Sequence, residues 1–216
     1  MKLHLGCGEY HFEGYVNIDY PITEHTVQQK SVADVEADIL SLKYPPDSVE
    51  EVRLHHVFEH FSRAHACALL ASWNSWTKIG GRLHIEVPDF AKTARAVLSV
   101  LSGKQAKAVA LRHLFGSQED HWAVHYQGYT VNGLKNLVGR FGYKTRAISR
   151  ARYLDTYNFE LIAAKVSTLT KEKAKETAAE YLCDSMVADS QSEKVLLKKW
   201  LEDYDCQIDR SFSATE

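Results

Sequence analysis

The chain has few cysteines, and their spacing gives them no structural task. Its four cysteines, Cys7, Cys67, Cys183 and Cys206, form neither a Cys-x-x-Cys pair nor the dense pattern of a small secreted scaffold. A zinc knuckle and a disulfide framework are therefore excluded as interpretations, and a reducing cytoplasm fits best. A chain of 216 residues buries roughly 70% of the surface that its unfolded state exposes, so its core needs no covalent support.

Long apolar runs and an excess of charge are also missing. No apolar stretch approaches the ~20 residues needed to cross a bilayer, and residues 1–20 lack the regions of a signal peptide. The 26 Lys and Arg residues against 28 Asp and Glu residues leave no positive excess to hold a polyphosphate backbone. We expect a soluble, cytoplasmic protein that binds neither a membrane nor a nucleic-acid duplex.

Short strands and amphipathic helices alternate along the first 168 residues, which we assign to one domain. Strands are predicted at Lys2–Leu5, Tyr15–Ile18, Val35–Ala37, Val49–His55, Leu83–Val87, Tyr143–Ile148 and Asn158–Val166. Helices are predicted from Ser62 to the glycine pair Gly80-Gly81, over 90–101 and 106–114, and after Thr130. This order predicts an α/β fold, in which a mostly parallel sheet has helices on both faces and one reversed strand at its edge.

Two segments depart from a simple alternation. Only Glu9 to Gly14 separates the first two strands, which is too short for a crossover helix, so we expect the first helix to be truncated. Residues 169–216 are polar and are predicted to form a helical C-terminal extension.

A glycine turn, Gly6-Cys7-Gly8, follows the first strand, at the end of the sheet where cofactors dock. It is not a dinucleotide fingerprint, because His11 replaces the third glycine and the acidic residue Asp19 arrives too early. No Gly-Lys-Ser/Thr follows, so a P-loop is also excluded. A cofactor without phosphate is therefore favoured. S-adenosylmethionine fits, since carboxylates can accept hydrogen bonds from its ribose and its adenine amino group.

Five motifs in order, KLHLGCG, GYVNIDY, VEADIL, VRLHHVFEHF and GGRLHIEVPDF, resemble those of class I S-adenosylmethionine-dependent methyltransferases. Type 11-like members, whose first helix is likewise reduced, are the most similar. The resemblance covers Met1 to about Val166, and it implies a Rossmann-like seven-stranded mixed sheet of order 3-2-1-4-5-7-6. It also implies S-adenosylmethionine as the cofactor.

The resemblance further implies a set of cofactor-binding residues. Gly6, Cys7 and Gly8 would line the methionine and ribose, and Asp19 would bind the ribose hydroxyls. Asp38 with Ile39 would contact adenine, and His55 and His56 would flank the methionine portion. Simpler roles stay open: a tight turn for the glycines, a cap or turn for Asp19 and Asp38, and packing for Cys7.

The loop 116–129 is rich in polar and aromatic residues and lies where this fold admits a methyl acceptor. Methyl transfer to a hydroxyl or amine requires alignment and removal of a proton, for which histidine is suited at neutral pH. The catalytic candidates are His125, His121 and His56. The sequence after the fourth strand lacks the Asn/Asp-Pro-Pro-Tyr/Phe signature, so amino methylation of nucleobases is disfavoured and a small-molecule or sugar-type acceptor is expected.

Four alternatives accompany this interpretation. The spacing of His56, Glu59 and His60 could bring metal-binding side chains together, but hydrogen bonding within the turn explains these residues too, and we assign no metal. A catalytically silent cofactor-binding or scaffold module and an NAD-type Rossmann oxidoreductase are the alternative functions. A basic stretch at 140–152 is interpreted as a solvated strand, with contact to an anionic acceptor as the alternative.

Overall fold

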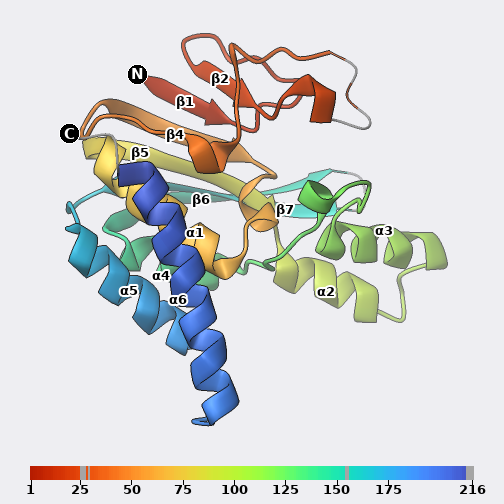
Figure 1. The fold of residues 1–216 in the computed structure, drawn as a ribbon. Coiled ribbons are helices and arrows are strands. Elements are labelled where there is room, and N and C mark those ends of the chain that lie inside the picture. Colours follow the sequence, from red (N-terminus) through yellow and green to blue (C-terminus); the bar gives the residue numbers. More distant parts are fainter. Residues whose placement is uncertain (25–27, 29, 154–155, 213–216) are drawn as a thin grey trace.

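A single seven-stranded sheet forms the centre of the computed structural model, with the strand order β3-β2-β1-β4-β5-β7-β6 (Figure 1). The structure describes residues 1–24, 28, 30–153 and 156–212. The strands are β1 (Lys2–Leu5), β2 (Val16–Asp19), β3 (Val35–Glu36), β4 (Val49–His55), β5 (Thr77–Pro88), β6 (Tyr143–Tyr153) and β7 (Thr156–Lys165). The predicted class and strand order are confirmed.

The direction of the last two strands corrects one detail of the prediction. β7 is antiparallel to both of its neighbours, β5 and β6, whereas the pairs from β3 across to β5 are parallel. The reversed strand is therefore β7, one position in from the edge. The edge strand β6 runs in the same direction as β5 because the short connection to β7 folds the two into a hairpin.

In the described residues, six α-helices and four short 3-10 helices accompany these strands, and the last two α-helices follow the final strand. The α-helices are α1 (Arg63–Trp76), α2 (Phe90–Leu98), α3 (Lys104–Phe115), α4 (Val131–Arg140), α5 (Lys171–Cys183) and α6 (Gln191–Phe212). The 3-10 helices are η1 (Ile22–Glu24), η2 (Ile39–Ser41), η3 (Phe58–His60) and η4 (His121–Ala123). Ser62 and Thr130 cap α1 and α4 as predicted, since their hydroxyls accept from the amides of His65 and Gly133.

The end of α1 differs from the sequence prediction. The helix stops at Trp76, and the glycine pair predicted to end it lies inside β5. Thr77 already pairs with Val49 of β4, so sheet pairing begins where the helix ends. The pairing register shifts just after this point, and a side chain on Gly81 would meet Thr77 Cγ2 at 2.6 Å. The glycines therefore allow an irregular strand start and do not terminate the helix.

One hydrophobic core lies against one face of the sheet. Alternate strand residues such as Leu3, Val52 and Leu83 are fully buried there and pack with α1 and α4. The C-terminal segment joins the same core, because Ala178 of α5 and Tyr204 of α6 are buried in it. In Figure 1, α5 and α6 lie beside α1.

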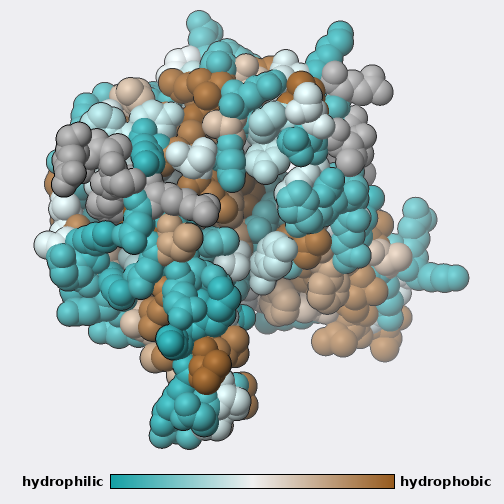
Figure 2. Space-filling view, in the orientation of Figure 1, coloured by the Kyte–Doolittle hydropathy of each residue, from teal (hydrophilic) through white to brown (hydrophobic). Residues whose placement is uncertain are grey.

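The α2–α3 pair carries an apolar surface. Leu98, Val100 and Leu101 near the connection between these helices are exposed by 80–94%. Figure 2 shows apolar residues gathered over this part of the molecule. Among the described residues, no helix combines the length and the apolar character that spanning a bilayer requires.

The opposite face of the sheet is polar. His4, Asn17, Glu51 and His84 point to this side and are buried, each exposed by no more than 7%. In the described residues, the connections from β1 to β2 and from β3 to β4 contain no α-helix, so the helical layer predicted on this face is reduced. Instead, the loop between β1 and β2 lies across it, with the ring of Phe12 centred 4.4 Å from that of His4.

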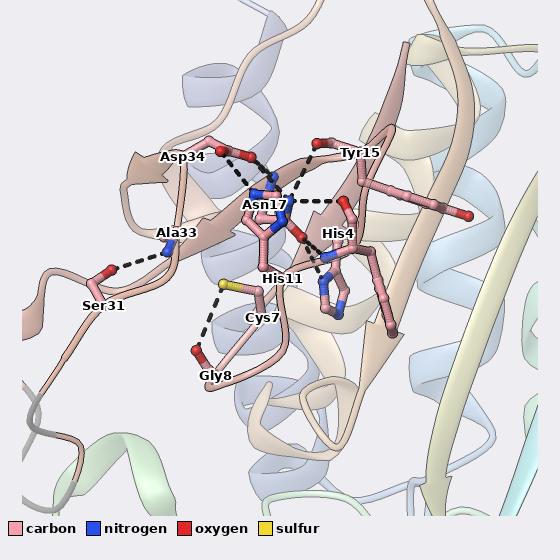
Figure 3. Close-up of polar contacts among 10 residues, drawn as sticks. His4, Cys7, Gly8, His11, Tyr15, Asn17, Ser31, Ala33 and Asp34 are labelled. Carbon is pink, nitrogen blue, oxygen red and sulfur yellow. Dashed lines mark hydrogen bonds and ion pairs between the residues drawn. The ribbon is translucent and has the colours of Figure 1, made fainter.

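Asn17 holds this loop in place (Figure 3). Its Oδ1 accepts from the Phe12 amide at 2.8 Å and lies 3.1 Å from Nδ1 of His4. Its Nδ2 donates to the carbonyls of Phe12 and Tyr15 and to Asp34. One buried amide thus pairs main-chain groups that a crossover helix would have paired internally.

Replacing Asn17 tests this role. We expect Asn17→Ala to lower the free energy of unfolding by about 2–4 kcal/mol, because several buried partners lose their hydrogen bonds at once. Urea denaturation of the variant measures the change, with Asn132→Ala on the exposed surface of α4 as the matched control. A loss no larger than that of the control would show that the loop is held by other contacts.

Candidate functional site

The glycine turn lies at the carboxyl end of β1, next to the end of β2. The amides of Gly6 and Cys7 donate to the carbonyl of Ile18, and the amide of Gly8 donates to Oδ2 of Asp19 at 2.7 Å. Asp19 also accepts from the Tyr20 amide at 2.8 Å, so main-chain bonds orient its buried carboxylate. The structure thus brings together four of the residues that the sequence assigns to the cofactor.

Gly6 has a further requirement. Its φ of +66° lies in the left-handed region, and a Cβ at this position would meet Cγ2 of Val57 at 2.3 Å. Only glycine allows the turn to pack this closely on the segment that follows β4.

Asp38 and Ile39 lie beyond β3, at the start of η2. The Asp38 carboxylate accepts from the Leu40 amide at 2.9 Å and so caps this short helix, which is the simpler role considered from the sequence. Ile39 is 9% exposed, and its side chain packs in the hydrophobic core. These contacts explain both residues structurally and leave their role toward a cofactor untested.

A cavity of about 570 Å³ lies near the end of β4. Its wall combines four histidines with residues of α3 and of the loop that follows it. The lining residues are His56, His60, Gln105, Val109, Arg112, His113, Gly116, Ser117, Glu119, Trp122, Ala123, His125 and Thr156. The predicted acceptor loop therefore forms one side of an actual cavity.

Main-chain hydrogen bonds attach this loop to η3. The amides of Tyr126 and Gln127 both donate to the carbonyl of Glu59, at 2.9 and 3.2 Å. Nδ1 of His60 lies 3.1 Å from the carbonyl of Val124. As a result His125, with a side chain only 11% exposed, reaches Glu59, and its Nε2 lies 3.9 Å from the carboxylate.

His121, the second catalytic candidate, occupies a different environment. Its side chain is 76% exposed and pairs with Asp120, and it does not line the cavity. The segment around it is helical only over His121–Ala123, so the two histidines do not share a helical face.

His56 follows the last residue of β4 and lies between two carboxylates. Its Nδ1 is 3.3 Å from Glu59 and its Nε2 is 3.4 Å from Glu86. Burial opposes the charged ring, but the two carboxylates outweigh it and raise the pKa of His56 to about 9. The ring is an imidazolium at neutral pH. Burial instead lowers the pKa of His125 and of His113, so both are neutral there.

His55, although adjacent in sequence, points to the polar face of the sheet. Arg53 places its two terminal nitrogens 2.8 Å from Nε2 of His55 and 2.8 Å from Nδ1 of His84. His84 in turn pairs with Glu160 through Nε2. Burial and the neighbouring Arg53 guanidinium lower the pKa of His55 to about 4. The rings of His55 and His56 therefore lie in different environments.

Comparisons with known proteins agree with this architecture. No family model and no curated protein matches the sequence. Among solved structures, a complex of the Haloferax volcanii Trm112 methyltransferase activator with a methyltransferase aligns at a TM-score of 0.52 and 10% identity, over 78% of this chain and 83% of that one.

Two further structures are similar at the same level. The 1,6-didemethyltoxoflavin-N1-methyltransferase of Burkholderia thailandensis, with S-adenosylhomocysteine bound, aligns at a TM-score of 0.51 and 14% identity, over 77% of this chain and 71% of that one. A Listeria monocytogenes protein described as an S-adenosylmethionine-dependent methyltransferase aligns at a TM-score of 0.50 and 15% identity, over 77% of this chain and 91% of that one. The chain has the class I methyltransferase fold.

Within this fold, the sequence patterns did not mark His113, which lines the cavity, or Glu86, which pairs with the lining residue His56. His113 lies near the end of α3, its Nε2 is 2.9 Å from the Asn158 side chain, and its ring centroid is 6.0 Å from that of His56. Glu86 was seen only as part of a strand motif, although it faces His56. Neither residue stands in a local pattern that marks it, because the sheet and the α3 packing bring them to the site.

The four cysteines lie in two different environments. Burial raises the pKa of Cys7 and of Cys67 to about 12, whereas Cys183 and Cys206 are exposed. We expect Ellman's reagent at pH 8 to modify two thiols in the native protein and four after unfolding. Rapid reaction of Cys7, identified by peptide mass mapping, would contradict a packing role for this residue.

The environment of His55 predicts a pH effect on stability. Its folded-state pKa of about 4 lies below the unfolded value near 6.5, so the unfolded state takes up a proton that the folded state does not. We expect the free energy of unfolding to fall by at most about 2 kcal/mol from this group between pH 7 and pH 5.

Urea denaturation at both pH values measures this effect. His55→Gln should show a smaller loss on acidification than the wild type, and the exposed His121→Gln variant should behave like the wild type. An unchanged pH dependence in His55→Gln would contradict the assignment.

Proposed function

We propose that the chain is an S-adenosylmethionine-dependent methyltransferase acting on a small-molecule or sugar-type acceptor. One observation carries the proposal: the glycine turn lies beside the histidine-lined cavity, one residue away from its wall. Gly6 contacts Val57, and the preceding residue, His56, lines that cavity. A cofactor held at the turn would thus lie beside a space for a second molecule, as methyl transfer requires.

A hydrogen bond also connects the acceptor loop to the segment that follows Asp19. Trp122 lines the cavity, and its indole nitrogen donates to the carbonyl of Glu24 at 3.2 Å. Glu24 ends η1, which follows Asp19 closely in the chain. The acceptor loop is therefore tied to the segment beyond the proposed ribose-binding carboxylate.

The proposed cofactor site uses the residues that the resemblance implies. Gly6, Cys7 and Gly8 line the methionine and ribose, and Asp19 accepts from the ribose hydroxyls. Asp38 and Ile39 lie by the adenine, and Oδ1 of Asp38 also caps η2. His56 is the histidine beside the methionine portion, while His55 acts on the polar face, among Arg53 and His84.

The size of the cavity and the charge of the chain support the proposed acceptor class. The cavity of about 570 Å³ is of the size of small-molecule sites, and its wall mixes an aromatic ring with polar groups. The formal charge of −2 gives no field that would gather a nucleic-acid duplex. Of the three catalytic candidates, His125 is the one that lines the cavity as a neutral ring.

Calorimetry with S-adenosylhomocysteine tests the cofactor site. We expect micromolar binding by the wild type and a loss of about 1–3 kcal/mol, roughly 5- to 150-fold in affinity, in Asp19→Ala, because a buried ligand hydroxyl loses its acceptor. Asp189→Ala, on the exposed surface before α6, is the matched control.

The same experiment separates the alternative functions. Heat with NAD but none with S-adenosylmethionine or S-adenosylhomocysteine would favour the oxidoreductase and overturn the proposal. Cofactor binding without turnover on any acceptor would favour the catalytically silent module.

A further inference from the structure

Three potential metal-binding side chains meet at one corner of the histidine-lined cavity. Glu59, His60 and His125 each direct one donor atom toward the others, and these three atoms lie within 4.8 Å of one another. Glu59 and His60 belong to η3, while His125 belongs to the loop anchored on it. Two imidazoles and one carboxylate form a donor set suited to divalent transition metals.

Glu59 provides the strongest sign that the group is incomplete. Its side chain is 1% exposed, and neither of its carboxylate oxygens has a hydrogen-bond partner in the described structure. A buried carboxylate without donors is costly and uncommon. The ring of His56 lies 3.3 Å away and contributes charge, but its geometry does not satisfy the oxygens.

The orientation of His60 supports the same conclusion. Its Nδ1 lies 3.1 Å from the carbonyl of Val124, which can only accept, so Nδ1 carries the proton. The lone pair of Nε2 is then available on the other side of the ring. A backbone carbonyl that fixes a histidine in this way is the usual outer contact of a metal-bound imidazole.

A second cluster, on the polar face of the sheet, lacks these features. His55, His84 and Glu160 are equally close to one another. However, Arg53 donates to a ring nitrogen of each histidine and lies 3.8 Å from Glu160. Arg53 thus occupies a ring-nitrogen lone pair of each histidine, so this cluster is structural.

We propose that Glu59, His60 and His125 bind one divalent transition-metal ion at the wall of the cavity. The three protein ligands leave coordination positions open toward the cavity, as in catalytic metal sites. The sequence analysis assigns no metal and gives His56, Glu59 and His60 as an alternative metal-binding set. The proposed site keeps Glu59 and His60 from that set, but its third ligand is the distant His125. That the ion would meet the methyl acceptor rests on the proposed function; the binding of the ion does not.

Cobalt titration of the chelator-treated full chain tests the site. We expect one Co²⁺ per chain with visible absorption bands, displaced by Zn²⁺, and calorimetry with Zn²⁺ should give the same stoichiometry. His60→Ala and His125→Ala should each weaken binding by more than about 100-fold, the upper end of what loss of an outer-shell partner costs. His121→Ala, in the same loop, and His84→Ala, in the second cluster, should bind like the wild type.

Several results would overturn the proposal. These are an absence of Co²⁺ binding, binding unchanged in both His60→Ala and His125→Ala, and equal losses in His121→Ala. Circular dichroism melting of each variant shows whether a loss of binding reflects unfolding, and Glu59→Gln, which removes the buried charge while keeping its shape, provides an independent ligand variant.

Calorimetry with S-adenosylhomocysteine on the same samples keeps the two proposals apart. Metal binding without cofactor binding would overturn the methyltransferase function and leave the metal site standing. Cofactor binding without metal binding would do the reverse.

Discussion

The polar face of the sheet depends on one buried amide. A loop laid across a sheet leaves main-chain donors and acceptors that no helix pairs, and burying them without partners is costly. Asn17 offers both donors and an acceptor in one side chain, and it pairs the main chain of Phe12 from both sides. Phe12 can then cover His4 and Arg53, so a short loop with one asparagine replaces a crossover helix.

Much of the fold could be predicted because the strands keep a strict alternation. Leu3-His4-Leu5 and Leu83-His84-Ile85 each place apolar residues toward the core and a histidine toward the other face. Boundaries that depend on distant pairing could not be predicted. The glycines after Trp76 resemble a helix stop, but the pairing of Thr77 with Val49 decides that a strand starts before them.

The candidate site could be predicted in part, where its residues lie at the ends of adjacent parallel strands. The glycine turn and Asp19 come together because adjacent parallel strands end at the same edge of the sheet. His125 and His121 could not be told apart, since both lie in one loop, four positions apart. The amides of Tyr126 and Gln127 donate to Glu59, and this long-range contact brings His125 inside while His121 stays at the surface.

Histidine serves two opposite purposes in this molecule, and the backbone at His56 separates them. His55 ends β4 facing Arg53, which donates to its Nε2, and burial together with this guanidinium lowers the pKa of His55. His56, with a φ of +53° that non-glycine residues seldom adopt, turns the chain toward Glu59 and the cavity. On the cavity side, the buried Glu59 carboxylate has no hydrogen-bond donor, and its negative charge favours a positively charged neighbour. Strain of this kind persists where the surroundings require it. At His56 the two carboxylates on either side of the ring supply that requirement, and the same turn brings Gly6 into contact with Val57.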